Sequence, residues 1–374
     1  MNKRERHIAC MLRQHPDKIP FMPGGPREKT LKRWAQEGLD PQKPWKPQLY
    51  EAISLPHEYG PAQEILDVSF KMIPIFEEKV LEHINGHYIV QDWMGAITEI
   101  SDEYDYTYIR EAIDFVTRKW HKFPVETRQD FEEMKKRYNV DDPLRFPEDF
   151  KEKCVRLKER DDLLTVTVNG PFWQLREWCG FEGLCMKMML EPYFVMEMME
   201  FWKGFVTQVL SRILDGIVFD RLYINEDMAY KAHSMISPEM TRRFVQPCYD
   251  EWVPLARQAG VPIIEVDSDG CVEELIPIWI ESDINVCSPI EVAAHNDLVA
   301  YSRLYKDQIS YVGGVDKRCI AKGGDIIAKE MERLAPVIKS GGYIPGCDHG
   351  VPHDISWQNF IGYCKILAQL TGWL

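Results

Sequence analysis

The sequence lacks the long apolar runs that mark membrane and export segments. No stretch of its 374 residues approaches the roughly 18 uninterrupted apolar residues of a membrane span. Residues 1–21 also lack the roughly 7 to 15 consecutive apolar residues of a secretory signal. We therefore expect a cytoplasmic protein that makes no membrane contact.

An excess of positive charge is also missing. The chain has 45 Lys and Arg against 59 Asp and Glu, a formal net charge of −14. Binding along nucleic-acid phosphates or an anionic membrane needs clustered Lys and Arg, so we expect neither partner. With 45% hydrophobic and 28% charged residues, the composition is that of a folded chain. We predict one domain over residues 1–374; the sequence does not set the oligomeric state.

Two groups of binding motif are absent. The ten cysteines include no CxxC pair, so most are expected to be small buried hydrophobes in a reducing compartment, with Cys347 as the exception. No GxGxxG or GxxxxGK[ST] follows the first expected strand, which argues against a dinucleotide or P-loop fold.

What the chain does have is a repeated strand and helix pattern. In the second half, apolar runs that end in Gly, Asn, Asp or Pro are each followed by a stretch of helical periodicity. A helix is expected from Ser237, which is a good N-cap. The five expected strand regions are residues 220–228, 261–270, 284–292, 309–318 and 341–352.

The first half contributes further elements. Strands are expected at 18–25 and 162–172, a hairpin at 87–100, and a long Met-rich helix at 191–214 whose Met and aromatic stripe favours core packing over a cofactor box. Strands alternating with helices imply a parallel sheet. We predict an α/β fold, a (β/α)8 TIM barrel with N-terminal helical additions and insertions.

In such a barrel the residues after each strand meet at one rim, where the chemistry is carried out. Many acidic side chains there would raise each other's pKa values unless a cation, a cationic substrate or shared protons offset them. The residues at these positions are Asn169, Glu226, Asp227, Asp267, Asp269, Glu291, Asp316, Lys317, Arg318, Cys347, Asp348, His349 and His353.

Each of these residues also has a structural interpretation. Asp and Asn after a strand are common N-caps and turn formers, and His349 or His353 alone is more simply a hydrogen-bonded or surface histidine. The pair Asp267 and Asp269 in DSDG favours a metal or acid-base role. Cys347 adds a thiolate that suits zinc, but a mixed oxygen and sulfur set does not decide which metal.

Several of these segments together resemble the uroporphyrinogen decarboxylase superfamily. They are KIPFMPGG, YINEDM with ISPEMTRRFVQPCYDEW, IIEVDSDG, YVGGVDKR and GGYIPGCDHGVPHDISWQNF. The resemblance covers nearly the whole chain from about residue 18 and is strongest after residue 220. It implies a (β/α)8 barrel and two possible activities, that of the heme-pathway decarboxylase and that of the zinc-dependent, corrinoid-linked methyltransferases.

The motifs favour the methyltransferase branch. The decarboxylase's two-arginine M-R-Q-A-G-R motif is absent, since only Arg27 and Arg33 are available in FMPGGPREKTLKRW, although His349 matches the family's C-terminal histidine. The methyltransferases carry an H-x-C-G motif and a later P-G-C. Here Asp267 and Asp269 stand where that His and Cys would be, and Cys347 matches the third ligand.

The resemblance leads to a first hypothesis, a metal-dependent methyltransferase. It moves a methyl group between a small methylated substrate, for example a methoxylated compound, and a corrinoid carried by a partner protein, because the chain has no D-x-H-x-x-G corrinoid-attachment motif. Zn²⁺ is expected on Asp267, Asp269 and Cys347, with Glu291, Glu226 or His349 completing the shell. The catalytic residues expected are Glu226, His349 and Asp348, with Glu226 or His349 as proton donor.

Two other hypotheses stay open. A metal-free carboxy-lyase for a small organic acid would use Asp267 or Asp269 to stabilise a cationic intermediate and His349 or Lys317 to handle a carboxylate. A barrel used only as a binding module needs the fewest assumptions. It leaves the carboxylate cluster without a purpose, and clustered ionisable groups at a rim are more often catalytic.

Overall fold

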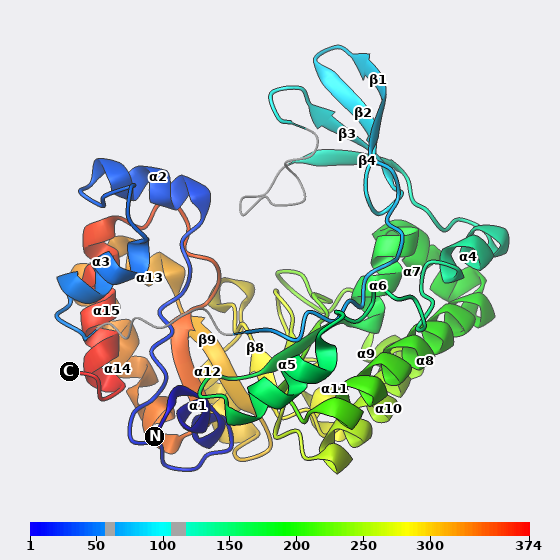
Figure 1. The fold of residues 1–374 in the computed structure, drawn as a ribbon. Coiled ribbons are helices and arrows are strands. Elements are labelled where there is room, and N and C mark those ends of the chain that lie inside the picture. Colours follow the sequence, from blue (N-terminus) through cyan, green and yellow to red (C-terminus); the bar gives the residue numbers. More distant parts are fainter. Residues whose placement is uncertain (57–63, 106–116) are drawn as a thin grey trace.

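A parallel sheet of six strands forms the centre of the molecule, which is a computed structural model describing residues 1–56, 64–105 and 117–374 (Figure 1). Each strand pairs with the next one along the chain, in the order β5-β6-β7-β8-β9-β10. All carboxyl ends therefore lie at one edge. The strands are β5 Thr165–Asn169, β6 Arg221–Asn225, β7 Ile263–Asp267, β8 Val286–Ser288, β9 Ser310–Val315 and β10 Tyr343–Cys347.

Helices follow the strands and flank the sheet, with α12 to α15 to the left and α6 to α10 to the right in the view of Figure 1. The predicted N-cap is confirmed, because the Ser237 hydroxyl accepts the Met240 N–H at 3.2 Å. The helices are α6 Pro171–Cys179, α7 Phe181–Leu190, α8 Pro192–Gly216, α9 Pro238–Met240, α10 Gln246–Ala259, α11 Ile276–Glu281, α12 Leu298–Leu304, α13 Lys317–Lys322, α14 Gly324–Ser340 and α15 Trp357–Leu370, with a π-helical turn at Thr241–Val245 and a 3-10 turn at Val292–Ala294.

The main hydrophobic core lies between the sheet and these helices. In β5 the side chains alternate, with Val166 and Val168 buried and Thr167 exposed, because successive residues of a strand point to opposite faces. On α8 the stripe that includes Met198 and Trp202 is fully buried, so the prediction of core packing is confirmed.

A closed eight-stranded barrel is not found among the described residues. The mixed α/β architecture with a parallel sheet is confirmed, but residues 18–25 form no strand. They run beside β10 with few backbone hydrogen bonds, from Cys347 N–H to Pro23 O and from Val351 N–H to Gly25 O. Pro20, Pro23 and Pro26 explain this difference, because proline has no N–H to donate to a ladder.

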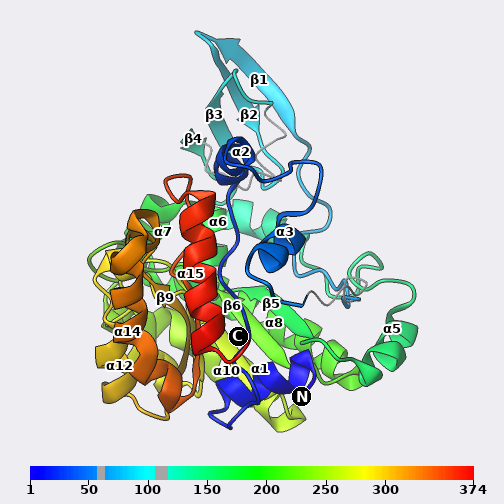
Figure 2. The same ribbon diagram turned by 90° about the vertical axis from the view of Figure 1, so that its left-hand side faces the viewer.

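The N-terminal half adds two groups of elements. The predicted helical additions are α1 Lys3–Met11, α2 Glu28–Gln36 and α3 Trp45–Ala52, followed later by α4 Arg128–Lys135, α5 Phe150–Arg156 and a 3-10 turn at Leu157–Glu159. An antiparallel sheet contains β1 Lys79–Ile84, β2 His87–Gln91, β3 Ile97–Ser101 and β4 Arg118–Lys122. It projects beyond the strand ends of the large sheet (Figures 1 and 2).

The hairpin expected at 87–100 is confirmed as β2 and β3, which pair from His87 with Ser101 to Gln91 with Ile97. Strands β1 and β4 were missed. Every residue of β1 is exposed and four of the five in β4 are, so neither has the apolar alternation that predicts a half-buried strand. Across the described ranges, no helix is both long and apolar enough to cross a membrane.

Candidate functional site

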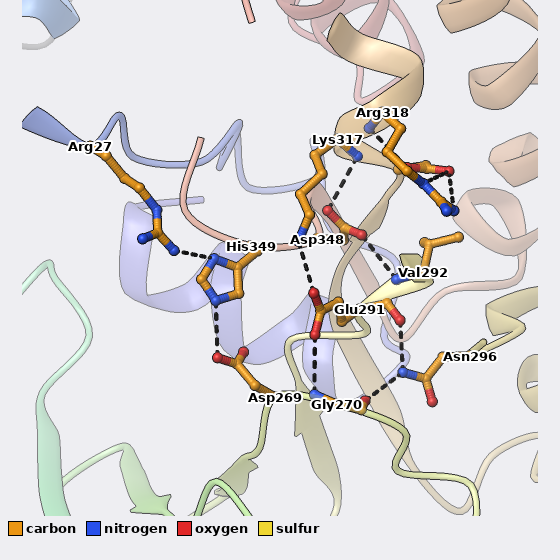
Figure 3. Close-up of polar contacts among 11 residues, drawn as sticks. Arg27, Asp269, Gly270, Glu291, Val292, Asn296, Lys317, Arg318, Asp348 and His349 are labelled. Carbon is orange, nitrogen blue, oxygen red and sulfur yellow. Dashed lines mark hydrogen bonds and ion pairs between the residues drawn. The ribbon is translucent and has the colours of Figure 1, made fainter. Parts of the chain in front are cut away.

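The carboxyl ends of the parallel strands bring residues that are distant in the sequence to one rim. Asn225 at the end of β6 is in register with Asp267 at the end of β7, and Asp267 is in register with Ser288 of β8. Cys347 at the end of β10 is in register with Val315 of β9. The turns that follow these strands hold the residues predicted for the site (Figure 3).

His349 lies between a carboxylate and a guanidinium (Figure 3). Its Nε2 is 2.9 Å from Asp269 Oδ2, and its Nδ1 is 2.9 Å from Arg27 Nη2. Arginine only donates, so Nδ1 accepts, and the neutral imidazole carries its proton on Nε2, toward Asp269. The hydrogen bond to Asp269 raises the pKa of His349, against burial and the charges of Lys317 and Arg27.

A second group of contacts joins the turns after β8, β9 and β10 (Figure 3). Lys317 Nζ donates to Glu291 Oε1 at 2.8 Å, and the Gly270 N–H donates to Glu291 Oε2 at 3.2 Å. Asp348 is completely buried and accepts the N–H groups of Val292 and Lys317 at 2.9 and 3.2 Å. Burial raises the pKa of Asp348 to about 6. Asp348 therefore holds the turns together.

Asp267 remains partly exposed at the rim. Its carbonyl oxygen accepts the N–H groups of Glu226 and Asp227, which bends the chain after β6 toward β7. Burial and then the nearby charge of Asp269 raise the pKa of the Asp267 carboxyl to about 7, while the Tyr223 hydroxyl favours its charged form. Near neutral pH this carboxyl can hold or release a proton.

Glu226, in contrast, has no exposed surface. The Tyr249 hydroxyl of α10 donates to its Oε1 at 2.5 Å, and the Trp173 N–H in the first turn of α6 donates to its Oε2 at 3.0 Å. Burial raises its pKa to about 7. A Cβ on Gly170 would overlap this carboxylate, so glycine is required there. Glu226 joins α6 to α10 and does not reach the rim surface.

The residues predicted as zinc ligands do not converge in this structure. Cys347 lies in the main hydrophobic cluster, where burial and then Asp348 raise the pKa of its thiol to about 12, whereas zinc needs the thiolate. Asp269 is bound to His349, and Glu291 to Lys317. No three His, Cys, Asp or Glu side chains of the described residues are grouped to hold a metal. In this arrangement the predicted ligands do not fit a zinc ion, and zinc binding stays a prediction.

Three carboxylates of the rim, those of Asp227, Glu291 and Asp316, are instead paired with cations of the same chain. Arg176 pairs with Asp227 at 2.9 Å, and Arg318 pairs with Asp316 at 2.8 Å. Asp316 also caps α13 by accepting the Arg318 N–H. Asp227 and Asp316 therefore fit the structural interpretation.

Two further residues of the predicted rim have different surroundings. The Asn169 amide donates to Gln174 at 3.0 Å, within its own strand–helix unit. His353 is exposed, and its carbonyl accepts a hydrogen bond from Arg33 at 2.8 Å. Sequence reasoning did not place Arg27, Tyr223 or Tyr249 at the site. Arg27 follows the strand expected at 18–25 but was considered only as part of the two-arginine motif, whereas Tyr249 lies in a helix and Tyr223 inside an expected strand, so position after a strand could not identify these two.

Comparison with known proteins bears on the fold. No protein-family model matches the chain, and no curated protein matches it in sequence. Among solved structures, a methyltransferase from Methanosarcina mazei superposes with a TM-score of 0.58 and 11% identity over 100% of this chain and 98% of that one. This likeness shows a shared fold. A B12-independent methionine synthase from Shewanella sp. W3-18-1 aligns over 60% and 65% of the two chains at 11% identity, with a TM-score of 0.38.

Proposed function

We infer that this protein is an enzyme of the uroporphyrinogen decarboxylase superfamily that moves a methyl group between a small methylated substrate and a corrinoid carried by a partner protein. Support comes from the fold shared over the full chain with a protein described as a methyltransferase and from the motifs around Asp267 and Cys347. The observation that carries the proposal is the rim, where His349 is held between Asp269 and Arg27.

Demethylation needs a proton at the substrate. The bond between the methyl group and its oxygen, nitrogen or sulfur breaks, a bond from the methyl group to the acceptor forms, and the heteroatom takes up a proton. A bound corrinoid supplies the methyl acceptor. His349, with Asp269 beside it, is the proposed proton donor, and Asp267 is a second group able to exchange a proton near pH 7. Glu226 acts as a positioning residue beneath α6.

The test is methylation of free cob(I)alamin by the purified protein with a panel of methoxybenzenes, methylamines and methyl thioethers, followed by visible absorption. We expect His349→Gln to lower kcat by about 10²-fold, the usual contribution of a general acid. His353→Gln is the matched control, because His353 is exposed on the same segment. A His349→Gln enzyme as fast as the wild type would overturn the assignment.

A carboxy-lyase acting on a small organic acid is the second candidate. It is favoured by the basic groups that the structure gathers at the rim, where Arg27 contacts His349 and Lys317 lies on the neighbouring turn. Such groups can hold a carboxylate. Two results together would favour this function over the first. The protein would release carbon dioxide from one of a panel of small acids, with the activity abolished by Arg27→Gln, and it would transfer no methyl group to cob(I)alamin.

A further inference from the structure

A cavity of about 450 Å³ lies between residues 21–25, strands β9 and β10, and helix α3. One wall is formed by residues 21–25 with the ends of β9 and β10, including Val312 and Gly346, and the other wall comes from α3. Its size falls within the range of small-molecule sites, which are mostly apolar with a few placed polar groups.

The walls of this cavity are largely aromatic and aliphatic. Phe21 and Tyr50 meet edge to face with ring centroids 5.8 Å apart, and Trp45 and Val312 line it as well. The side chain of Lys46 also lines the cavity. It is exposed on α3, with its ammonium 5.8 Å from the centre of the Trp45 ring. Apolar walls with one ammonium suit a ligand that has an apolar ring and a single negative charge.

The cavity is next to the candidate site along the chain. Cys347 lines it, and Asp348 and His349 follow directly. Gly25 also lines it, and a Cβ added there would meet no atom within 4 Å. A larger residue fits the backbone of Gly25, because its φ is not positive and it precedes a proline, which favours extended conformations.

We propose that this cavity binds the body of the substrate, and that the substrate is a small aromatic or cyclic compound carrying one carboxylate, with its ring against Phe21, Trp45 and Tyr50 and its carboxylate on Lys46. The proposal rests on the proposed function only for the identity of the ligand as substrate. Binding itself is measured without any turnover.

Isothermal titration calorimetry with three matched probes tests this site. The probes are 3-phenylpropionate, which has the ring and the charge; 3-phenylpropanol, which has the ring alone; and propionate, which has the charge alone. We expect 3-phenylpropionate to bind at least about tenfold more tightly than either of the others. Equal binding of all three, or no binding of any, overturns the proposal.

Variants then locate the binding. Lys46→Gln should weaken 3-phenylpropionate about tenfold and leave 3-phenylpropanol unchanged, whereas Lys43→Gln, outside the cavity, should change neither. Gly25→Val should weaken both ring compounds. Gly183→Val is its control, since a Cβ there also meets no atom within 4 Å but lies on α7. Unchanged affinity in both Lys46→Gln and Gly25→Val overturns the site.

A second filling variant separates loss of binding from loss of folding. Val312→Phe fills the cavity from strand β9, and thermal unfolding of each variant reports whether it is folded. A folded Val312→Phe protein with wild-type affinity would also count against the site. Probe binding without methyl transfer to cob(I)alamin would uphold this inference and reject the proposed function, and methyl transfer that is insensitive to Gly25→Val would do the reverse.

Discussion

His349 and Asp269 lie 80 positions apart in the sequence, yet Nε2 of His349 is 2.9 Å from Oδ2 of Asp269. The contact exists because β7 and β10 are parallel strands whose following turns reach the same rim. It connects the two sequence segments that carried most of the functional prediction.

The first prediction concerns this pair. Because Asp269 raises the pKa of His349, Asp269→Asn should lower it, which an NMR titration of the imidazole measures. A histidine pKa raised in the folded state adds stability below the ordinary value of 6.5, and that stability is lost as the pH rises through the folded pKa. Because Asp269 is 41% exposed, we expect Asp269→Asn to lose about 0.5 kcal/mol of unfolding free energy at pH 5.5 and none at pH 9. Asp354→Asn, exposed nearby, is the control, and an unmoved imidazole titration in Asp269→Asn would contradict the assignment.

Asp267 should show a pH dependence of its own. Its pKa rises from 3.8 to about 7, so ionisation of this carboxyl in the unfolded chain costs the folded protein stability as the pH rises from about 4 to 7. Asp267→Asn removes that cost. The variant should therefore gain roughly 2 kcal/mol in unfolding free energy relative to wild type at pH 8.5, and much less at pH 5. Urea unfolding at the two pH values measures the difference, and equal gains at both would show that ionisation is not the cause.

Gly170 and Glu226 form the third test. Gly170→Ala places a methyl group against the buried Glu226 carboxylate and should destabilise the protein by about 2 kcal/mol. Gly183→Ala on α7 meets no atom and should instead stabilise it by roughly 0.5 kcal/mol. Chemical denaturation of both variants measures the contrast. Similar effects of the two substitutions would mean that Glu226 is not packed as described.

The fourth prediction concerns Asp348. Asp348→Ala leaves the N–H groups of Val292 and Lys317 without their acceptor inside the protein, which should cost about 3 kcal/mol of unfolding free energy. Asp354→Ala, on the same segment but exposed, should stay within about 0.5 kcal/mol of wild type. A stable Asp348→Ala protein that is inactive would instead give Asp348 the catalytic role expected from the sequence.

Zinc is the fifth. For it to bind, Glu291 must leave Lys317, Asp269 must leave His349, and the Cys347 thiol must lose its proton. If the sequence prediction holds, protein purified without chelator contains about one zinc per chain, and zinc raises the Tm of wild type but not of Asp267→Ala or Cys347→Ala. Elemental analysis and thermal unfolding measure these two quantities. Wild-type protein that contains no zinc and whose Tm is unchanged by added zinc would contradict the prediction.

The sequence by itself determined the strand and helix order of the second half, because apolar runs with turn residues after them and N-caps such as Ser237 are local signals. It also identified Asp267, Asp269 and His349 as members of one rim, since parallel strands bring their carboxyl ends together. The exposed strands β1 and β4 were missed because their side chains carry no burial pattern.

Only the tertiary structure decided which partner each rim residue takes. Arg27 reaches His349 and Tyr249 reaches Glu226 from segments whose positions depend on packing across the whole chain, and no local pattern encodes such a distance. The sequence contains prolines at 20, 23 and 26, but their effect depends on the neighbouring strand. Only the tertiary structure shows that residues 18–25 lie beside β10 without forming a ladder with it. Local patterns set the elements, whereas burial and charge pairing set the chemistry at their ends.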